Sequence, residues 1–356
     1  MKVSALTVGR NTPSARFRVR QYIEFLKRDG ITVKEHFAGI EKSQQIPFLN
    51  NRIRTRYYLP LHVTLEVTKM ISNIPRVYHA NRSDIVWLQR DLISGMPTLE
   101  YFIKKPIVFD IDDAIWLSKP FGKFTIEQIC KRSSLIFAGN EFIRNYLSRY
   151  NTNIVIVPTA IDTDRFKPSF YTRDAVDEFV IGWTGTSINL IYLIKIEKPL
   201  SAFLKKWPNT YIHILCDVIP KFKHLPSDKL RFTQWAVNNE CDIIRNWDVG
   251  IMPLPGDEFS KGKCSFKMLQ YMASEIPVIV SNVGMNVHIL QKSLVGIGID
   301  DDSQWVDALE HLYFNKNTSS EMGVNGRKVV LSEYSALKIS KEIAVHFKSL
   351  RSGADI

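Results

Sequence analysis

Residues 261–284 read KGKCSFKMLQYMASEIPVIVSNVG, and this stretch predicts the fold more clearly than any other part of the chain. Its first part has the spacing of an amphipathic helix, and PVIVS is a short β-rich run that ends near Gly284. The predicted helix has a polar and an apolar stripe. The polar stripe is formed by Lys263, Lys267, Gln270 and Ser274, and the apolar stripe by Phe266, Leu269, Met272 and Ala273. We expect the apolar face to pack and the polar face to be open to a ligand.

The predicted helix begins beside two lysines. The first amides of a helix lack partners within it, and the helix dipole adds positive charge there. The backbone near Cys264 and Ser265, together with Lys263 and Lys267, therefore predicts a site for an anion such as phosphate. An ordinary core helix followed by a strand is the plain alternative.

The segment from Gln270 to Ser281, QYMASEIPVIVS, resembles the nucleotide-sugar signature of the GT-B glycosyltransferases, especially glycosyltransferase family 4, the group 1 glycosyltransferases. In that family a Glu-x7-Glu pair precedes an Ala-Met-Ala-like helix end and a Pro-Val-Val-Ala-Ser-like strand. Gly262 and Gln270 occupy the two glutamate positions here, so neither carboxylate is present. Gln270 can still hydrogen-bond a ribose hydroxyl, whereas Gly262 has no side chain to hold a sugar.

Length and composition fit two α/β domains. The chain has 356 residues, of which 45% are hydrophobic and 23% charged. Predicted strands and helices alternate as in two doubly wound, Rossmann-like domains, and the resemblance implies that the two face a central cleft, as in GT-B proteins. The expected parts are an N-terminal acceptor domain over residues 1–168, a linker near 167–178, a nucleotide-sugar domain over 178–332 and a C-terminal helix, about 333–356, that crosses back onto the first domain.

The four cysteines and the first residues bear on the compartment. Cys130, Cys216, Cys241 and Cys264 lie far apart without Cys-x-x-Cys spacing, which disfavours a zinc site or a disulfide framework, so we expect reduced, mostly buried thiols. No long apolar segment follows Met1, so neither a signal peptide nor a spanning helix is predicted. We expect a cytoplasmic protein, with peripheral attachment to the inner face of the membrane as a further expectation.

Basic residues outnumber acidic ones, 47 to 36, for a formal net charge of +11. Residues 10–58 alone hold eleven basic and four acidic residues. Such a basic front could face nucleic acid, an anionic membrane surface or a pyrophosphate-linked acceptor, or be an ordinary solvated surface. Because the chain has no recognised nucleic-acid-binding motif, we expect no nucleic acid as a partner.

The first strand, KVSALTVG, leads into a predicted helix. Thr12 is expected to cap that helix, Pro13 to stand at its first position, and Gly30 to end it. Arg16 and Arg18 then lie near the carboxyl end of the strand, where family members commonly have a Gly-rich loop. Since arginine makes forked contacts to anions, we expect both to bind the acceptor.

Residues 59–71, LPLHVTLEVTKMI, predict a helix after a basic and aromatic segment. This helix could be an interfacial membrane patch or the outer layer of the N-terminal domain. Its short length and mixed polar face favour the packing helix.

The strand PIVFDIDD ends in Asp110, Asp112 and Asp113, and alternation places Asp110 and Asp112 on one face. Open α/β sheets bind ligands at such strand ends. The resembling family has a histidine at the position of Asp112, so the resemblance makes Asp112 and Asp113 the candidate catalytic residues. An Asp-x-Asp metal site, as in GT-A enzymes, and helix capping by Asp113 are alternatives. The GT-B signature favours a site without metal or cofactor.

The second domain opens with FVIGWTGTSINL, whose loop could approach phosphate. Trp235 lies where family members contact the base, although a packing tryptophan is equally open. His213, in the middle of a strand, predicts a hydrogen-bonded core histidine. The candidate donor-binding residues are Gly185, Thr186, Trp235, Lys263, Ser265, Phe266, Lys267 and Gln270.

The resemblance implies a metal-independent, retaining glycosyltransferase that moves a sugar from a nucleoside-diphosphate sugar to an acceptor hydroxyl. The expected acceptor is a glycan or a lipid-linked glycan in the synthesis of a bacterial surface polysaccharide or glycolipid. The two lysines and the amides near Ser265 would stabilise the leaving diphosphate. Two alternatives stay open: a catalytically silent nucleotide-binding or scaffold subunit, favoured by the loss of both glutamates, and a basic nucleic-acid-binding protein.

Overall fold

The structure is a computed structural model that describes residues 1–40, 59–169 and 178–353. The described chain forms two compact units. Unit 1 comprises Met1–Thr159 and Leu337–Ile356, and unit 2 comprises Ala160–Ala336. Most of the linker predicted near residues 167–178 lies outside the described residues.

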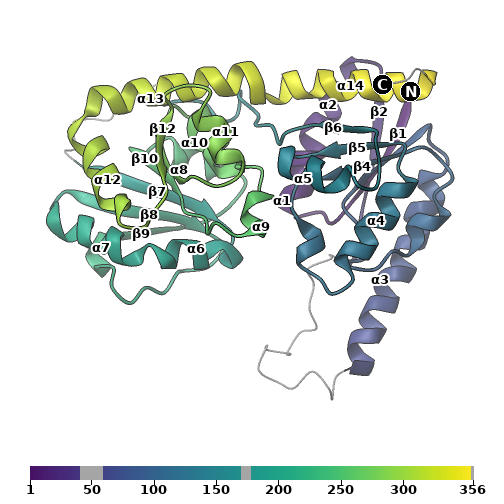
Figure 1. Cartoon of the computed structure of the whole chain (residues 1–356), viewed down its shortest axis with the longest axis horizontal. Helices are drawn as coiled ribbons and strands as arrows, with labels where there is room; N and C mark the ends of the chain where they lie inside the picture. The colour runs from purple at the N-terminus through teal and green to yellow at the C-terminus, as the bar shows by residue number, and fades with distance from the viewer. Residues whose placement is uncertain (41–58, 170–177, 354–356) are drawn as a thin grey trace. The chain divides into compact units, whose positions relative to one another are not determined.

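Unit 1 contains a six-stranded parallel sheet with the strand order β2-β1-β3-β4-β5-β6 (Figure 1). The strands are β1 (Lys2–Thr7), β2 (Thr32–Phe37), β3 (Ile85–Gln89), β4 (Ile107–Ile111), β5 (Leu135–Ala138) and β6 (Ile154–Ile156). The helices are α1 (Pro13–Arg18), α2 (Ile23–Arg28), α3 (Leu59–Ala80), α4 (Gly122–Arg132), α5 (Glu141–Leu147) and α14 (Ala336–Ser352), with 3-10 turns η1 (Arg20–Tyr22), η3 (Leu99–Phe102) and η4 (Ile115–Leu117).

Unit 2 repeats this plan with the order β12-β11-β10-β7-β8-β9. The strands are β7 (Phe179–Gly185), β8 (Thr210–Cys216), β9 (Leu230–Gln234), β10 (Val249–Met252), β11 (Val278–Ser281) and β12 (Gly296–Ile299). The helices are α6 (Leu190–Lys195), α7 (Glu197–Lys206), α8 (Glu240–Ile244), α9 (Glu258–Lys261), α10 (Phe266–Ala273), α11 (Met285–Leu290), α12 (Gln304–Phe314) and α13 (Lys316–Val329). The shorter turns are η5 (Ser187–Asn189), η6 (Ser227–Lys229) and the π-helical η7 (Val330–Tyr334).

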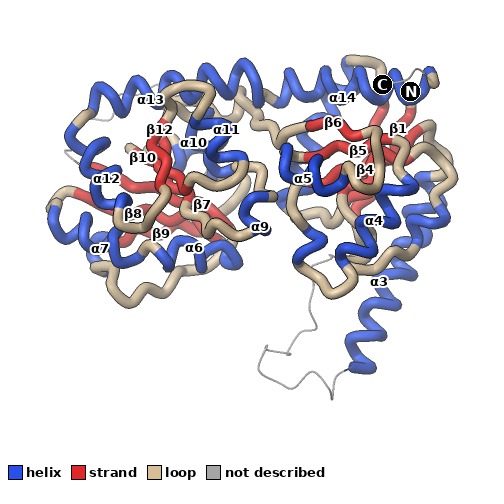
Figure 2. Tube along the Cα trace, viewed as in Figure 1, coloured by secondary structure: helices blue, strands red, loops and turns tan. Residues whose placement is uncertain are grey.

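Both sheets are doubly wound, which confirms the predicted fold class. In each unit the first strand lies inside the sheet, and the chain builds outward on one side of it before crossing to the other. The order therefore reverses between β1 and β3 in unit 1 and between β7 and β10 in unit 2. Helices flank the strands of each unit (Figure 2). Sheets of this kind bind ligands outside the carboxyl ends of the strands at such a switch point.

Apolar packing fixes the helices of unit 2 on both faces of its sheet. Met268 and Leu269 of α10 belong to one core cluster, and Phe203 of α7 and Trp305 of α12 belong to the other. Gly182 in the middle of β7 is required for this packing, because a Cβ there would lie 1.8 Å from the ring of Trp247. The core thus sets the position of α10 relative to the central strands.

The helix predicted from Thr12 to Gly30 forms in three pieces, α1, η1 and α2, with a break at Val19. Pro13 stands at its start as predicted, but Thr12 makes no side-chain cap hydrogen bond. At the end of the chain, the aromatic ring of Phe347 in α14 packs against Trp87 and Phe137 of unit 1, with centroids 5.3 and 5.8 Å apart.

Two further predictions concern single residues and α3. The four cysteines carry free thiols, and Cys130, Cys216 and Cys264 are buried, as predicted. The helix favoured as a packing layer, α3, contacts β1 and η3, but from residue 63 onward it leaves six large apolar side chains exposed. Within the described ranges, no helix combines the length and apolarity that crossing a membrane requires.

Candidate active site

The carboxyl ends of β7 and β10 lie side by side in unit 2, because Ile181 pairs with Val249 and Gly182 with Gly250. The chain leaves β7 through Thr186 into η5, and it leaves β10 through α9 into α10. Both connections therefore start at the switch point of this sheet, where a ligand is expected.

Two lysines lie over aromatic rings at this switch point. The Nζ atom of Lys267 is 5.5 Å from the ring centroid of Trp183, and that of Lys263 is 4.9 Å from the centroid of Phe259. An aromatic face attracts an ammonium group and orients it without neutralising its charge. Gly185 allows this arrangement, since a Cβ there would come within 2.9 Å of Lys267 Cε. The structure thus brings together Gly185 and Lys267, which were selected as candidates from two different segments of the sequence.

Helix α10 begins in a strained conformation. Ser265, the residue before the first turn, has φ 52°, in the left-handed region that a serine rarely adopts. Its hydroxyl donates a hydrogen bond of 2.6 Å to Asn286 Oδ1, and Asn286 Nδ2 donates to the carbonyl of Ser281 at the end of β11. These buried bonds hold the start of α10 at the sheet, with the positive end of its dipole beside Lys267.

The polar stripe of α10 is not an open face, which corrects the prediction. Gln270 and Ser274 are buried. The Gln270 amide Nε2 donates 2.8 Å to Glu240 Oε1, and the Ser274 hydroxyl donates to the carbonyl of Gln270. Polar side chains can be buried when partners satisfy them, and periodicity along one helix does not show such partners. Only the first turn, Phe266 and Lys267, is partly exposed.

Glu240 is a site residue that the sequence analysis missed. Its buried carboxylate accepts from Gln270 through one oxygen and pairs with Arg165 Nη2 at 3.3 Å through the other. It lies thirty residues before Gln270 in the chain, at the start of α8. A carboxylate therefore stands next to position 270 although the helix itself carries none. The acidic start of α8 was its only sequence signal.

The loop after β7 is fixed by Asp217. The backbone amide and the hydroxyl of Ser187 donate to the two carboxylate oxygens of Asp217 at 2.6 and 2.9 Å, and Asn189 Nδ2 donates to the hydroxyl of Thr186 at 2.9 Å. Burial acts to raise the pKa of Asp217, but hydrogen bonds from Ser187 and Cys216 outweigh it and lower that pKa. Asp217 is therefore ionised at neutral pH. Its place directly after a buried strand could have marked it in the sequence.

Trp235 and His213 take packing positions. Trp235 is partly buried against the core of unit 2, and its backbone amide donates to the carbonyl of Cys216 at 2.8 Å. His213 Nε2 lies 2.9 Å from the hydroxyl of Thr233, as expected for a hydrogen-bonded strand histidine. Burial, assisted by the charge of Arg231, lowers the pKa of His213 to about 4, so its imidazole is neutral at pH 7.

In unit 1 the predicted acceptor residue Arg18 is buried, which corrects the prediction. Its Nε donates to Asp110 Oδ1 at 2.8 Å, and its Nη1 donates to the carbonyl of Val157 at 2.7 Å. Both Arg18 and Asp110 have side chains only 1% exposed. The pair links the helix after β1 to strand β4 within the core. Arg16 is half-buried, with its guanidinium 4.1 Å from the ring centroid of Phe17.

Asp112 and Asp113, which follow β4, are both bound by Arg90, which follows β3. Arg90 Nε lies 2.7 Å from Asp112 Oδ1, and Arg90 Nη2 lies 2.5 Å from Asp113 Oδ2. Burial would raise the pKa of Asp112, but the charge and hydrogen bond of Arg90 outweigh it and lower that pKa. Arg90 itself has φ 61°, so its backbone adopts the left-handed conformation from which it holds both carboxylates. Arg90 was not among the residues predicted from the sequence.

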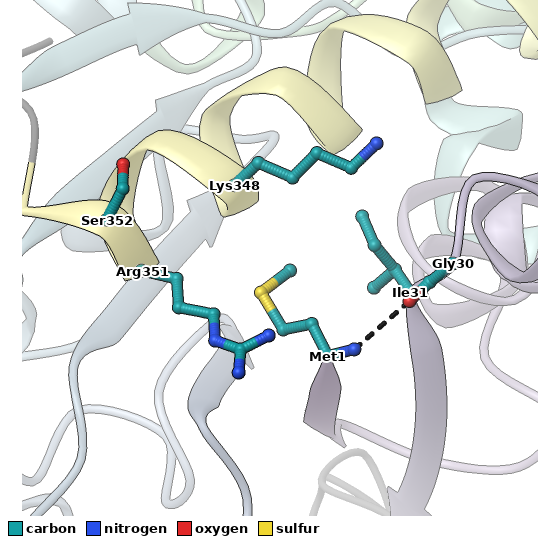
Figure 3. Close-up of a pocket in the computed structure, with 6 residues that line it drawn as sticks. All are labelled: Met1, Gly30, Ile31, Lys348, Arg351 and Ser352. Carbon is teal, nitrogen blue, oxygen red and sulfur yellow. Dashed lines mark hydrogen bonds between the residues drawn. The ribbon is translucent and has the colours of Figure 1, made fainter.

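The structure also has a hollow of about 340 Å³ away from these strand ends (Figure 3). It is lined by Met1, Gly30, Ile31, Lys348, Arg351 and Ser352, at the amino ends of β1 and β2. Its position excludes it from the candidate site. Among the described residues, no cluster of three or more His, Cys, Asp or Glu side chains could hold a metal ion.

Known structures share this architecture over the whole chain. Sucrose-phosphate synthase from Thermosynechococcus elongatus is 13% identical, with a TM-score of 0.74 over 99% of this chain and 100% of that one. Anabaena HepE in complex with UDP and glucose is 11% identical, with a TM-score of 0.69 over 98% and 100%. WaaG, a glycosyltransferase involved in lipopolysaccharide biosynthesis, is 12% identical, with a TM-score of 0.65 over 96% and 98%.

No protein-family model and no curated protein sequence matches the chain. At 11 to 13% identity the structural likeness establishes the fold alone. The resemblance first noted in residues 270–281 is thus supported over nearly the full length, and the chain has the fold of the GT-B glycosyltransferases.

Proposed function

We propose that this protein is a glycosyltransferase that moves a sugar from a nucleoside-diphosphate sugar to an acceptor hydroxyl. The observation that carries the proposal is the position of Lys263, Lys267 and the start of α10 at the switch point of β7 and β10. Two ammonium groups and a helix N-terminus provide fixed positive charge at a place where α/β sheets bind ligands.

The same groups can act in the reaction. When the bond between the sugar and the diphosphate breaks, negative charge develops on the leaving phosphate. Lys267 and Lys263, each oriented by an aromatic ring, would stabilise that charge more in the transition state than in the bound donor. We propose on this ground that the reaction needs no metal ion, and, by resemblance to family 4, that it retains the anomeric configuration.

The remaining donor contacts are proposed by residue. Gly185 and Thr186 would approach the diphosphate through the loop that Asp217 fixes. Trp235 would lie toward the nucleoside. Gln270 would act indirectly, because it is buried and bound to the carboxylate of Glu240. UDP is the first nucleotide to test, because HepE, which shares the fold, was solved with UDP and with UDP-glucose.

On the acceptor side, we assign Asp112 and Asp113 to positioning. A carboxylate whose pKa is lowered by Arg90 is a weak general base at neutral pH, so proton removal is not its expected role. Two carboxylates held in place by Arg90 can instead accept hydrogen bonds from sugar hydroxyls, and Arg16 would hold an acceptor phosphate. The proposed acceptor is a glycan or a lipid-linked glycan of a bacterial surface polysaccharide or glycolipid, presented in the cytoplasm at an anionic membrane.

A donor screen tests this proposal. The free protein is heated with UDP, GDP, ADP or TDP, and with their sugars, and the unfolding midpoint is recorded. A ligand at a hundred times its dissociation constant stabilises the fold by about 2.7 kcal/mol. Release of the free nucleotide is then measured with the stabilising donor. Absence of a shift with every nucleotide would contradict the proposal.

A catalytically silent nucleotide-binding subunit is the second candidate. The two glutamate positions of the family signature hold Gly262 and Gln270 in this chain. In addition, the amide of Gln270 is already bound by Glu240. A protein that binds a nucleotide sugar in the screen, but neither transfers nor hydrolyses it, would favour this second function.

A further inference from the structure

Helix α3 is amphipathic in the inverted sense. From residue 63 onward it exposes six large apolar side chains, with fractional exposures of 37–57%: Val63, Val67, Met70, Ile71, Ile74 and Tyr78. At 3.6 residues per turn, these six positions fall within an arc of about 100°. A helix of a water-soluble domain normally turns such a stripe toward the core.

The opposite side of α3 is buried, and it carries polar and charged side chains. Lys69, Asn73 and Arg76 are at most 7% exposed. Arg76 donates to the carbonyls of Thr7 and His36 at the carboxyl ends of β1 and β2, and Lys69 pairs with Glu66 at 2.8 Å. These bonds anchor the helix through its polar face and leave the apolar stripe outward.

The position of α3 also favours an external partner. Within unit 1 its contacts are chiefly with β1 and η3, and its N-terminal half extends beyond the other helices of that unit (Figure 1). Among the described side chains of α3, from residue 63 onward, the charged groups of Lys, Arg and Glu lie on the anchored side or its edge. The outward stripe therefore buries no charge when it is covered.

One exposed arginine borders this stripe, because Arg82 stacks over the ring of Tyr78 at 4.5 Å. Further basic residues lie at the end of β2, which contacts the anchored side of α3. There Lys34 is exposed, and Arg10 lies 5.1 Å over the ring of Phe37. Unit 1 as a whole has 28 Lys and Arg against 15 Asp and Glu, a net +13, whereas unit 2 has 19 against 21, a net −2.

We infer that the outward stripe of α3 is a docking surface for an anionic lipid membrane. An uncharged apolar stripe bordered by an arginine, on a unit of net charge +13, has the chemistry of a helix that lies in the plane of an anionic membrane interface. Docking there would hold unit 1 at the lipid surface, because Arg76 ties the opposite side of α3 to the carboxyl ends of β1 and β2. The inference extends the proposed function by giving a lipid-linked acceptor a route to unit 1, but its test needs no transferase activity.

The test is flotation of the full-length protein with phosphatidylcholine vesicles, with or without phosphatidylglycerol. We expect wild-type protein to float with the anionic vesicles and less so at high salt. Ile71→Glu with Ile74→Glu should reduce the partition at least about tenfold, because both apolar anchors become charged. Val345→Glu, at a valine 60% exposed on α14 of the same unit, should float like wild type.

Three outcomes would overturn the inference: wild type that stays unbound with anionic vesicles, a double variant that floats like wild type, or flotation lost equally in Val345→Glu. A wild-type dimer that the double variant converts to a monomer, without vesicle binding, would assign the stripe to a second copy of the chain. The thermal shift with UDP is measured on the same double variant. An unchanged shift separates loss of docking from failure of the proposed donor site.

Discussion

The two units share one sheet plan and differ in the charges at their strand ends. In unit 1 two arginines near these ends are bound to aspartates: Arg18 to Asp110, and Arg90 to Asp112 and Asp113. In unit 2 the two lysines near the switch point lie over aromatic rings, which attract and orient their ammonium groups. The candidate anion site is thus in the unit of net charge −2, not in the unit of +13. Net charge predicts which surface attracts anions, whereas local donors predict where one binds.

Breaking the buried pair of unit 1 should have the largest effect. Asp110→Ala leaves Arg18 charged and without its carboxylate in the core, and we expect a loss of about 3–5 kcal/mol in the free energy of unfolding. Urea unfolding measures it. Lys131→Ala, which removes an exposed pair with Glu127 in the same unit, should change the stability by less than about 1 kcal/mol. Equal effects of both substitutions would show that the Arg18 pair is not structural.

Asp112→Asn tests whether the strand end of unit 1 serves catalysis. The substitution keeps the shape and removes a charge that Arg90 holds. If Asp112 positions the acceptor, turnover should fall on the order of 10²-fold while donor affinity stays the same. Initial rates with the donor found in the screen, and the dissociation constant of that donor, measure the two effects. Normal turnover would make Asp112 a structural residue.

Gln270→Leu addresses the buried contact in unit 2. It leaves Glu240 without its amide donor, so we expect the free energy of unfolding to fall by about 1–3 kcal/mol. If Gln270 also bonds the ribose, donor affinity falls as well. Gln270→Asn, which keeps an amide but shortens the side chain, is the control for loss of reach. Unchanged stability in the leucine variant would mean that Glu240 finds another partner.

The smallest expected effect concerns pH. His213 has a pKa of about 4 in the folded protein against 6.5 in an unfolded chain, so the unfolded state binds the proton more readily between these values. The free energy of unfolding should therefore rise with pH from about 4 to 6.5, and His213 should contribute about 1–3 kcal/mol of that rise. Above pH 6.5 its contribution should be constant. His213→Gln should reduce this slope in urea unfolding at pH 5 and 7, whereas His311→Gln, at an exposed histidine, should not. A slope unchanged by His213→Gln would assign the dependence to other groups.

The sequence predicted what depends on neighbours along the chain. The helix and strand of residues 261–284, Pro13 at the start of α1, and the two parallel sheets follow from local periodicity and turn residues. Contacts between distant residues were not predictable in this way. Arg18 is hydrogen-bonded to Asp110, 92 residues away in the sequence, and Gln270 to Glu240, 30 residues away. The spacing of residues along one helix therefore could not show that Arg18 and Gln270 are buried.

Helix α3 shows the same limit from another side. Periodicity indicates which residues share a face, but not which face the fold covers. In α3 the face that carries Arg76 is the buried one, because Arg76 donates hydrogen bonds to two carbonyls at the strand ends. Its pKa is lowered to about 10 by burial, so it still carries its charge there at neutral pH.

The central claim is that α10 and its lysines bind a nucleoside diphosphate, and calorimetric titration with UDP tests it most directly. We predict that Lys267→Ala weakens binding by about 1.5–3 kcal/mol, roughly 10- to 100-fold, because a charge-assisted contact to phosphate is lost. Lys263→Ala should weaken it by a similar amount. Lys261→Ala, which removes a neighbouring lysine paired with Glu258, should bind like wild type. Equal affinity in all three variants and the wild type would contradict the claim.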